Sequence, residues 1–401
     1  MQVAYFVHDL SDSAVARRIG MLRAAGAQVR LLGFRRTAGA PATVAGLEPY
    51  DLGRTHDARL AARAVAVAAN LVKLPSFRRF VDGADVILAR NLETLVLAAA
   101  ARALHAPRAR LAYECLDIHG AMLSPGLRGR LLRRLEGALL DRCDSLLVSS
   151  PGFVREYFEP FQGARSRPRL QSVLVENKVF GPQPARPPRP PPGPPWRIGW
   201  FGMVRCRRSL DALHDLARRR PDLVEVIIRG RPSYTEFDDF EGQCASLPNL
   251  RFLGPYAPQD LPALYGETHF NWSIDYFQDE GNSRWLLPNR LYEGGLYGAP
   301  PIARRGSEAA AWLADQGLGL VFDRPEVELE AFLDRLAPEA YATLAAIHAA
   351  APAQRFLAGP EDCQVLAEAL RGARAPIEPL ARPERLARAA VAPVAPAADL
   401  H

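Results

Sequence analysis

The sequence lacks the signals of several specialised protein classes. Its five cysteines are scattered and no C-x-x-C occurs, so neither a zinc site nor a disulfide framework is predicted, and reduced thiols are expected. Lysine is nearly absent, and the arginines that replace it are spread along the whole chain. The net charge of +6 therefore comes from no basic block, and we expect no nucleic-acid partner.

Segments that could cross a membrane or bind a cofactor are also missing. The longest apolar stretch, Ala61 to Leu74, is too short and too interrupted to span a bilayer. The first residues, MQVAYFVHDL, lack the basic region and cleavage site of a signal peptide. No metal-ligand cluster is evident, and no G-x-G-x-x-G follows a candidate strand, which argues against an NAD-dependent dehydrogenase. We expect a cytoplasmic protein without a metal or cofactor.

What the sequence does contain is a repeated strand–helix alternation. A length of 401 residues exceeds one hydrophobic core, so two domains are expected. Alternating short apolar and longer amphipathic runs predict β-α-β units, and hence two doubly wound, Rossmann-like α/β domains. The candidate strands are Val3–Val7, Val29–Phe34, Val86–Ala89, Leu111–Tyr113, Leu146–Ser149 and Ser172–Val175, then Ile198–Phe201, Val224–Arg229, Arg251–Leu253, Phe270–Ile274, Pro301–Ala303 and Leu318–Phe322. Candidate helices include Ala14–Ala25, Leu92–Leu104 and Leu127–Leu140.

A proline run, GPQPARPPRPPPGPPW, separates the two halves. Proline suits neither a helix interior nor a central strand, so residues 181–196 are predicted to form a semi-rigid linker. The linker divides an N-terminal domain, 1–180, from a C-terminal domain, 197–355, and the two would face each other across a ligand cleft. The Ala/Pro/Arg-rich residues 375–401 are expected to be a disordered tail.

The stretch from Asn282 to Arg305 carries the most informative pattern. A helix predicted over Asn289–Tyr297 bears Glu293 and leads through Gly298 into a strand. A carboxylate in a cleft needs a hydrogen-bonding partner, and a ribose diol is one that can donate two hydrogen bonds to it. The alternative is a solvent-facing glutamate on an ordinary amphipathic helix.

A second stretch, IGWFGMVRCRRSLDALHDLA, predicts an anion site. A strand ends near Gly202, and a helix is expected to begin near Ser209, whose hydroxyl is a candidate N-cap. The helix N-terminus with Arg205 and Arg208 could bind a diphosphate, although these arginines could also be solvated loop residues. Gly230 ends the next strand in a similar loop.

In the first half, LAYECLDIHG places Glu114, Asp117 and His119 after a strand. Ligand sites of doubly wound folds lie at the carboxyl ends of strands. An aspartate or histidine there could remove a proton from an acceptor hydroxyl, so Asp117 and His119 are the catalytic candidates. Local capping and turn hydrogen bonds are the alternative for both. His8 and Asp9, after the first strand, are weaker candidates for the same surface.

These motifs resemble those of family 4-like (group 1) glycosyltransferases of the GT-B fold. The likeness rests on Leu291–Tyr292–Glu293 followed by Gly298–Ala299–Pro300–Pro301–Ile302. It implies that Glu293 binds the donor ribose and that the helix beginning at Asn289 belongs to the donor site, with Arg208 and Gly230 nearby. It also implies that a helix within 356–374 crosses back to the first domain.

The sequence departs from the family pattern at two positions. The glutamate that usually contacts the donor sugar is Trp285 here, so Asn282, Ser283 and Arg284 are expected to contact the sugar or diphosphate instead. The usual arginine near the diphosphate is Met203, and Arg205 would have to substitute for it. Donor identity and the retaining or inverting outcome therefore stay open.

The resemblance implies a metal-independent hexosyltransferase that uses a nucleoside-diphosphate sugar, such as a UDP-sugar, and a saccharide or polyprenyl-linked acceptor. The sequence looks closest to bacterial exopolysaccharide, succinoglycan-type transferases. Arg-rich amphipathic segments such as Leu127–Leu140 could contact an anionic membrane at its cytoplasmic face, or could simply face the core. The alternative functions are a nucleotide-sugar epimerase of the same architecture and a catalytically silent binding protein.

Overall fold

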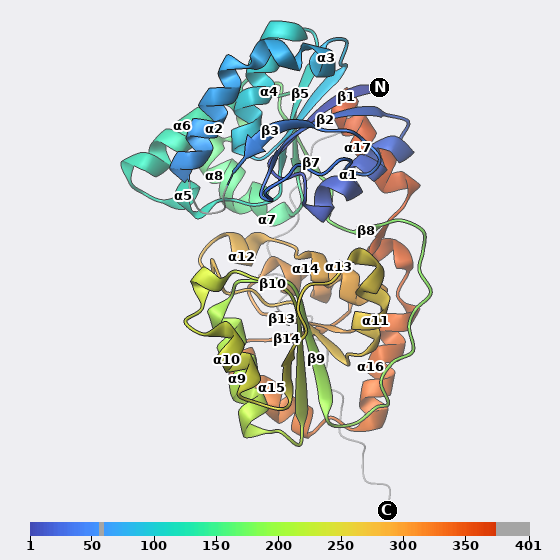
Figure 1. Cartoon of the computed structure of the whole chain (residues 1–401). Helices are drawn as coiled ribbons and strands as arrows, with labels where there is room; N and C mark the ends of the chain where they lie inside the picture. The colour runs from blue at the N-terminus through green and yellow to red at the C-terminus, as the bar shows by residue number, and fades with distance from the viewer. Residues whose placement is uncertain (56–59, 374–401) are drawn as a thin grey trace, which may run out of the picture. The chain divides into compact units, whose positions relative to one another are not determined.

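The computed structural model describes residues 1–55 and 60–373 and divides them into two compact units (Figure 1). The first unit contains Met1–Phe180 and the segment that begins at Ala358, and the second contains Gly181–Leu357. The predicted disordered tail, 375–401, lies outside the described residues, as does residue 374. Each unit is built on one parallel sheet.

The first sheet has seven parallel strands in the order β3-β2-β1-β4-β5-β6-β7. Its central strands are almost wholly buried and apolar, because helices cover both faces of a parallel sheet. The strands are β1 Gln2–Val7, β2 Gln28–Arg35, β3 Tyr50–Arg54, β4 Val86–Arg90, β5 Arg110–Cys115, β6 Ser145–Val148 and β7 Gln171–Leu174.

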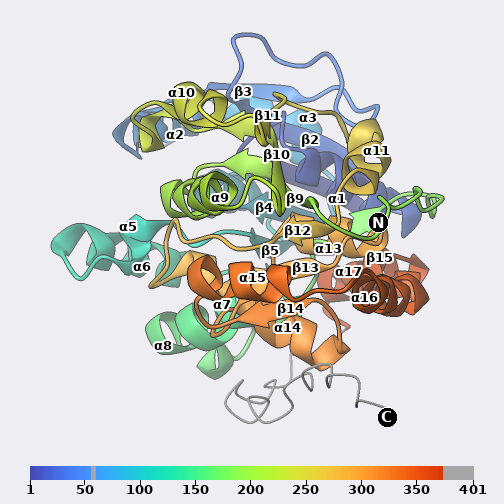
Figure 2. The same ribbon diagram turned by 90° about the horizontal axis from the view of Figure 1, so that it is seen from below.

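Helices cover this sheet in two groups. One face carries α1 and α17, and the other carries α2, α3, α4 and α6, with α4 packed against the other three (Figure 1). Figure 2 also shows α2 and α6 on the side away from α1 and α17. The helices are α1 Ser13–Ala24, α2 Leu60–Val72, α3 Arg78–Val81, α4 Leu92–His105, α5 Gly120–Leu123, α6 Leu127–Leu140, α7 Pro151–Phe153, α8 Glu159–Gln162 and α17 Pro360–Arg371.

The helix α17 belongs to the first unit although it lies near the end of the chain. The Ser145 hydroxyl donates to the Ala369 carbonyl over 2.7 Å, and Lys178 donates to Asp362 over 2.9 Å. Leu366 and Leu370 are buried in the same core as β1 and α1. The short strands β8, Val179–Phe180, and β15, Leu357–Ala358, pair with each other where the chain passes between the units.

The second sheet has six parallel strands in the order β11-β10-β9-β12-β13-β14. The strands are β9 Trp196–Val204, β10 Val224–Pro232, β11 Leu250–Phe252, β12 Phe270–Trp272, β13 Pro301–Arg304 and β14 Leu320–Phe322. The helices are α9 Arg207–Arg219, α10 Phe240–Ala245, α11 Leu261–Gly266, α12 Asn282–Trp285, α13 Asn289–Leu296, α14 Glu308–Gln316, α15 Pro325–Asp334 and α16 Pro338–Ala350.

The proline-rich segment that precedes β9 is anchored to the second unit. The Arg189 guanidinium donates to the carbonyls of Tyr265, Thr268 and His269, and Arg186 donates to the Leu296 carbonyl. These bonds satisfy carbonyls at loop and helix ends that would otherwise lack partners. The segment is therefore part of the second unit and not a free spacer.

Local structure differs from the sequence prediction at three points. The strand β3 was not predicted, and the apolar stretch after it forms the helix α2. The prediction of Ser209 as an N-cap is wrong, because α9 begins two residues earlier and Cys206 is its N-cap. The Cys206 sulfur accepts a hydrogen bond from the Ser209 backbone N–H over 3.4 Å, which puts Ser209 inside the first turn.

Candidate functional site

Most of the residues predicted to bind the sugar donor lie near the carboxyl ends of the strands of the second sheet. Arg205 directly follows β9, Gly230 lies near the end of β10, and Asn282 begins α12, in the connection between β12 and β13. In a doubly wound fold this edge is where ligands bind, because strand ends and helix N-termini present unpaired backbone groups there.

Glu293 lies on α13 and is held by one aromatic residue of α11. The Tyr265 hydroxyl donates to Oε2 of Glu293 over 3.1 Å. Burial and the nearby Glu293 carboxylate raise the pKa of Tyr265 well above its ordinary value, so this phenol stays a hydrogen-bond donor. The Tyr265 ring also stacks on Tyr297 and meets Phe201 edge to face. Glu293 is therefore a positioned carboxylate and not a loose surface side chain.

Gly230 is a place where two strands approach too closely for a side chain. Its φ is 141°, and it pairs in register with Gly202, whose φ is 113°. A Cβ on Gly230 would stand 1.7 Å from the Gly202 carbonyl oxygen. Both positions require glycine, because only glycine adopts these positive φ values without strain. Gly202 and Gly230 therefore let the ends of β9 and β10 approach without an intervening side chain.

Arg205 and Arg208 both lie beside carboxylates. Arg205 is 3.5 Å from Asp275 and its guanidinium lies over the Phe277 ring. Arg208 donates to Glu326 over 2.6 Å and lies 3.5 Å from Asp279. These guanidinium groups are held at the edge of the sheet by acids of the same unit, so an incoming anion would share or replace those partners.

Sequence reasoning missed a third arginine in this cluster. Arg304, at the end of β13, forms an ion pair with Asp279. Both guanidinium groups also lie over the Tyr276 ring, that of Arg208 at 4.1 Å and that of Arg304 at 5.1 Å from its centroid. No local signal marked Arg304, because only the parallel register brings the ends of β9 and β13 to the same edge.

The residues of α12 have different environments. Asn282 is buried, while the Ser283 hydroxyl accepts a hydrogen bond from the Gln278 backbone N–H over 3.0 Å. Arg284 is exposed, and its Nε donates to the Gly306 carbonyl at 3.4 Å. Trp285 ends this short helix.

Arg290 is a second residue that sequence reasoning missed. It follows Asn289 in the first turn of α13 and is buried, with its terminal nitrogen donating to the Ile274 carbonyl over 3.1 Å. Its Nε is buried without a hydrogen-bond partner among the described residues. Asn271 holds the same turn by donating to the Arg290 carbonyl over 2.6 Å. A buried guanidinium with an unused donor is suited to bind an anion.

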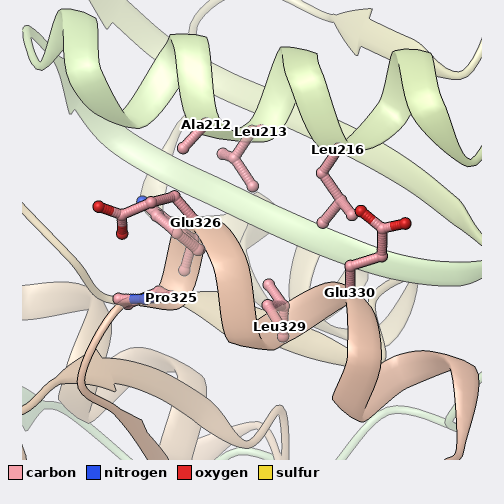
Figure 3. A pocket seen from close by; sticks show the side chains of 8 residues that line it. Ala212, Leu213, Leu216, Pro325, Glu326, Leu329 and Glu330 are labelled. Atoms are coloured by element: carbon pink, nitrogen blue, oxygen red, sulfur yellow. The ribbon is translucent and has the colours of Figure 1, made fainter.

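A small pocket between α9 and α15 lies beside this cluster (Figure 3). Its lining is mostly apolar, with Leu213, Leu216 and Leu329 among the residues that form it. Figure 3 shows Glu326 and Glu330 on α15 at its two ends. The pocket is a small gap in the packing between the two helices. Glu326, which lines it, accepts a hydrogen bond from Arg208.

In the first unit, Glu114 is a structural residue within β5. It is fully buried and receives hydrogen bonds from Arg18 (2.6 Å), Arg90 (2.9 Å) and the Tyr5 hydroxyl (2.5 Å). Despite burial, these donors lower its pKa to about 2, so the carboxylate is ionised. Arg90 also reaches Asp12, the N-cap of α1, over 3.4 Å. The network fixes the loop that follows β1.

Asp117 and His119 lie in the loop between β5 and α5. His119 is the N-cap of α5, and its Nδ1 accepts a hydrogen bond from the Ala121 N–H over 3.1 Å. Burial and the positive charge of Arg63 lower the pKa of His119, which favours the neutral ring. Because Nδ1 is the acceptor, the proton of that neutral ring is on Nε2, which can donate a hydrogen bond. Asp117 is exposed beside it.

Two further residues border this loop. Glu93, in the first turn of α4, forms an ion pair with Arg63 of α2. His8 follows β1, and burial lowers its pKa with Glu93 and Asp12 among the nearby charges. The predicted residues thus form two groups: Asp117, His119 and His8 at the edge of the first sheet, and the donor-side residues at the edge of the second.

Three expectations from the sequence concern the cysteines, metal ligands and membrane-spanning helices. All five cysteines are buried and unpaired. Within residues 1–55 and 60–373, no group of three or more histidine, cysteine or acidic side chains is arranged to hold a metal ion. Over the same ranges, no helix has both the length and the hydropathy needed to span a bilayer.

Comparison with known proteins identifies the family. Residues 13–174 match the glycosyl transferase 4-like domain. The chain is 44% identical over 354 residues to the succinoglycan biosynthesis protein ExoL of Rhizobium meliloti (strain 1021), covering 86% of this chain and 87% of ExoL.

Solved structures show the same fold. HepE of Anabaena, crystallised with UDP and glucose, superposes with a TM-score of 0.64 at 18% identity, over 92% of this chain and 99% of HepE. Sucrose-phosphate synthase of Thermosynechococcus elongatus gives 0.66 at 15% identity, over 92% of this chain and 97% of the synthase. The predicted family resemblance and GT-B fold are confirmed: the chain contains a glycosyl transferase 4-like domain, belongs to the same family as ExoL, and is a GT-B glycosyltransferase.

Proposed function

We propose that this glycosyltransferase moves a hexose from a UDP-sugar to a saccharide or polyprenyl-linked acceptor during assembly of a succinoglycan-type exopolysaccharide. ExoL is a succinoglycan biosynthesis protein, and HepE has been crystallised with UDP and glucose, which supports this donor and pathway. The enzyme would work at the cytoplasmic face of the inner membrane, where a polyprenyl-linked acceptor is accessible. No cofactor other than the donor substrate is proposed.

The observation that carries the donor assignment is the position of Glu293. It lies on a helix at the carboxyl edge of the second sheet, with one oxygen already fixed by Tyr265. A carboxylate can accept hydrogen bonds from several donors, and the two hydroxyls of a ribose are suited to donate to it. The paired glycines Gly202 and Gly230 lie near the ends of β9 and β10, so no side chain at these positions would obstruct the nucleotide.

The diphosphate is proposed to bind among Arg205, Arg208, Arg290 and the α12 residues. Negative charge accumulates on the leaving diphosphate as the bond to the sugar breaks, and preorganised cations stabilise that charge. Arg290 offers an unused buried donor, and Asn289 begins the same helix, whose N-terminal N–H groups favour anions. Asn282, Ser283 and Arg284 are proposed to contact the sugar or the diphosphate.

On the acceptor side, we assign the proton transfer to Asp117 and a binding role to His119. The acceptor oxygen forms a bond to the anomeric carbon, the bond from that carbon to the diphosphate breaks, and the acceptor proton leaves. Asp117 is exposed and can accept that proton. His119 uses Nδ1 to cap α5, so its Nε2–H is the group left to donate to a substrate oxygen.

Calorimetric titration of the full chain with UDP, GDP and ADP tests the donor assignment. We expect one nucleotide, UDP, to bind, and Glu293→Ala to weaken it by roughly 10- to 100-fold, the loss of a hydrogen bond to a charged group. Glu339→Ala, an exposed glutamate on α16, is the matched control. Wild-type binding to none of the three nucleotides, or equal binding by Glu293→Ala, would overturn the assignment. Sugar transfer that requires an added acceptor separates this function from epimerisation.

A further inference from the structure

The helix α6 exposes a stripe of leucines to solvent. Leu127, Leu131 and Leu135 follow each other at intervals of four and are 63%, 54% and 44% exposed. Residues at this spacing lie on one face of a helix. The stripe is therefore a solvent-facing surface, and the alternative that it faces the core is wrong for these three positions.

Unpaired arginines flank this stripe. Arg128, Arg130 and Arg134 are exposed, and none forms an ion pair or a side-chain hydrogen bond within residues 1–55 and 60–373. Arg133, on the inward side, instead donates to the Met122 and Ser124 carbonyls. From Leu127 to Ala138 the exposed face of α6 has no acidic residue. Apolar and basic side chains share one face. Such a face suits an anionic bilayer, because apolar side chains can enter the boundary of the acyl chains while basic ones contact the anionic headgroups.

The helix α2, on the same side of the sheet, extends the apolar surface. Val65 and Val72 are 69% and 83% exposed, and most of the remaining exposed positions of this helix are alanine or leucine. The only charged residue among its thirteen residues is Arg63, which is paired with Glu93. An uncharged, exposed helix face is unusual for a protein surface in water, where charged residues normally predominate.

This surface borders the candidate acceptor site. Arg63 on α2 and Arg128 on α6 both lie near enough to His119 for their charge to act on its ring. A headgroup in contact with α6 would therefore lie close to the loop of Asp117 and His119. The location of the surface favours a lipid over a protein partner, because a lipid-linked acceptor would reach this loop from the bilayer.

From these observations we infer that α2 and the exposed face of α6 form a docking surface for an anionic lipid bilayer. The leucines and valines enter the headgroup region while Arg128, Arg130 and Arg134 contact lipid phosphates. The inference deepens the proposed function. It rests on that function only in assigning the docking surface to the cytoplasmic side of the membrane. Vesicle binding does not depend on sugar transfer, so the two can fail separately.

Flotation of the full chain with vesicles of phosphatidylglycerol and phosphatidylcholine, or of phosphatidylcholine alone, tests the inference. We expect binding to the anionic vesicles that falls with added salt. The Leu131→Gln/Leu135→Gln variant should bind at least tenfold more weakly. Its matched control is Val327→Gln/Ile347→Gln, which changes two residues of the second unit with 57% and 49% exposure.

A second pair of variants tests whether vesicle binding requires the arginines of α6. Arg128→Gln/Arg130→Gln/Arg134→Gln should lose roughly fivefold in affinity per arginine. Arg218→Gln/Arg335→Gln/Arg371→Gln has the same change in net charge and should bind as wild type does. Unchanged UDP affinity in all variants shows that the second unit is intact.

Three results would overturn the inference. One is absence of binding to anionic vesicles by a wild-type chain that binds UDP. Another is equal loss of binding in the test variants and their controls. The third is a wild-type dimer in sedimentation velocity that the Leu131→Gln/Leu135→Gln variant converts to monomer, which would assign the surface to a second copy of the chain.

Discussion

The Tyr265 hydroxyl donates a hydrogen bond to Oε2 of Glu293 over 3.1 Å and joins α11 to α13. This bond restricts the carboxylate to one orientation before any ligand arrives. Preorganisation of this kind reduces the entropy lost when a ligand binds. Tyr265 is therefore a positioning residue for Glu293 under the proposed function.

Tyr265→Phe should weaken UDP binding by about 2- to 10-fold, which corresponds to the net contribution of one hydrogen bond. The effect should be smaller than that of Glu293→Gln, because the latter changes the group that contacts the ribose. Calorimetry of both single variants and the double variant measures it. A double variant no weaker than Glu293→Gln shows that Tyr265 acts through Glu293; additive losses would contradict the positioning role.

Arg208→Gln should weaken binding of UDP by about 5- to 30-fold and leave uridine binding unchanged. The reason is that the guanidinium acts on the diphosphate, which uridine lacks. Arg207→Gln is the control, because Arg207 is the neighbouring residue and pairs with exposed Asp238. Competition between the two ligands in a calorimeter gives both affinities. Parallel losses for UDP and uridine would show a structural effect and remove Arg208 from the phosphate site.

The sequence predicted twelve strands of the two sheets because each is a short apolar run between turn residues. The strand β3 was missed because Tyr50–Arg54 is not an apolar run. It contains Asp51, Gly53 and Arg54, and only Leu52 is buried. α2, an alanine-rich apolar stretch, was not predicted as a helix, and most of its described side chains are exposed. Local composition thus predicts elements that bury a face and misses those that do not.

The candidate site was predictable only where residues are neighbours in sequence. Glu293 could be recognised from the motif around it. Arg290, Arg304 and Tyr276 gave no comparable signal. Arg304 and Tyr276 come together through strand order, and the buried Nε of Arg290 is visible only once its surroundings are packed. These residues come together through contacts between positions that are far apart in the sequence, and local patterns in a single sequence do not show such contacts.

Asp117→Asn should lower kcat by roughly 10²- to 10⁴-fold, the usual contribution of a general base, with the KM for the UDP-sugar unchanged. His119→Asn should have a smaller effect, because asparagine can still cap α5 but cannot supply the Nε2–H donor. Steady-state kinetics with a saccharide acceptor measure both. A larger loss for His119→Asn than for Asp117→Asn would reverse the proposed roles.

Glu136 of α6 is a buried carboxylic acid whose protonation should affect stability. Tyr113 and Tyr157 donate their hydroxyl hydrogens to its carboxylate, and Gln162 donates over 2.7 Å. Burial nevertheless raises the pKa of Glu136 to about 7 from its ordinary value of 4.5. A raised folded-state pKa means that the protonated form stabilises the fold fully below pH 4.5, and that this stabilisation is lost as the pH rises through about 7.

Glu136→Gln has no proton to lose, so its stability should not show this dependence. The melting temperature of the variant minus that of the wild type should therefore increase between pH 5 and pH 8.5, by the equivalent of roughly 1–3 kcal/mol. Glu114 does not interfere, since its pKa of about 2 is lowered and its stabilisation is lost only as the pH falls from about 4.5 through 2. Scanning calorimetry across this range measures the difference. A constant difference would mean that the three hydrogen bonds outweigh burial and that Glu136 is ionised throughout.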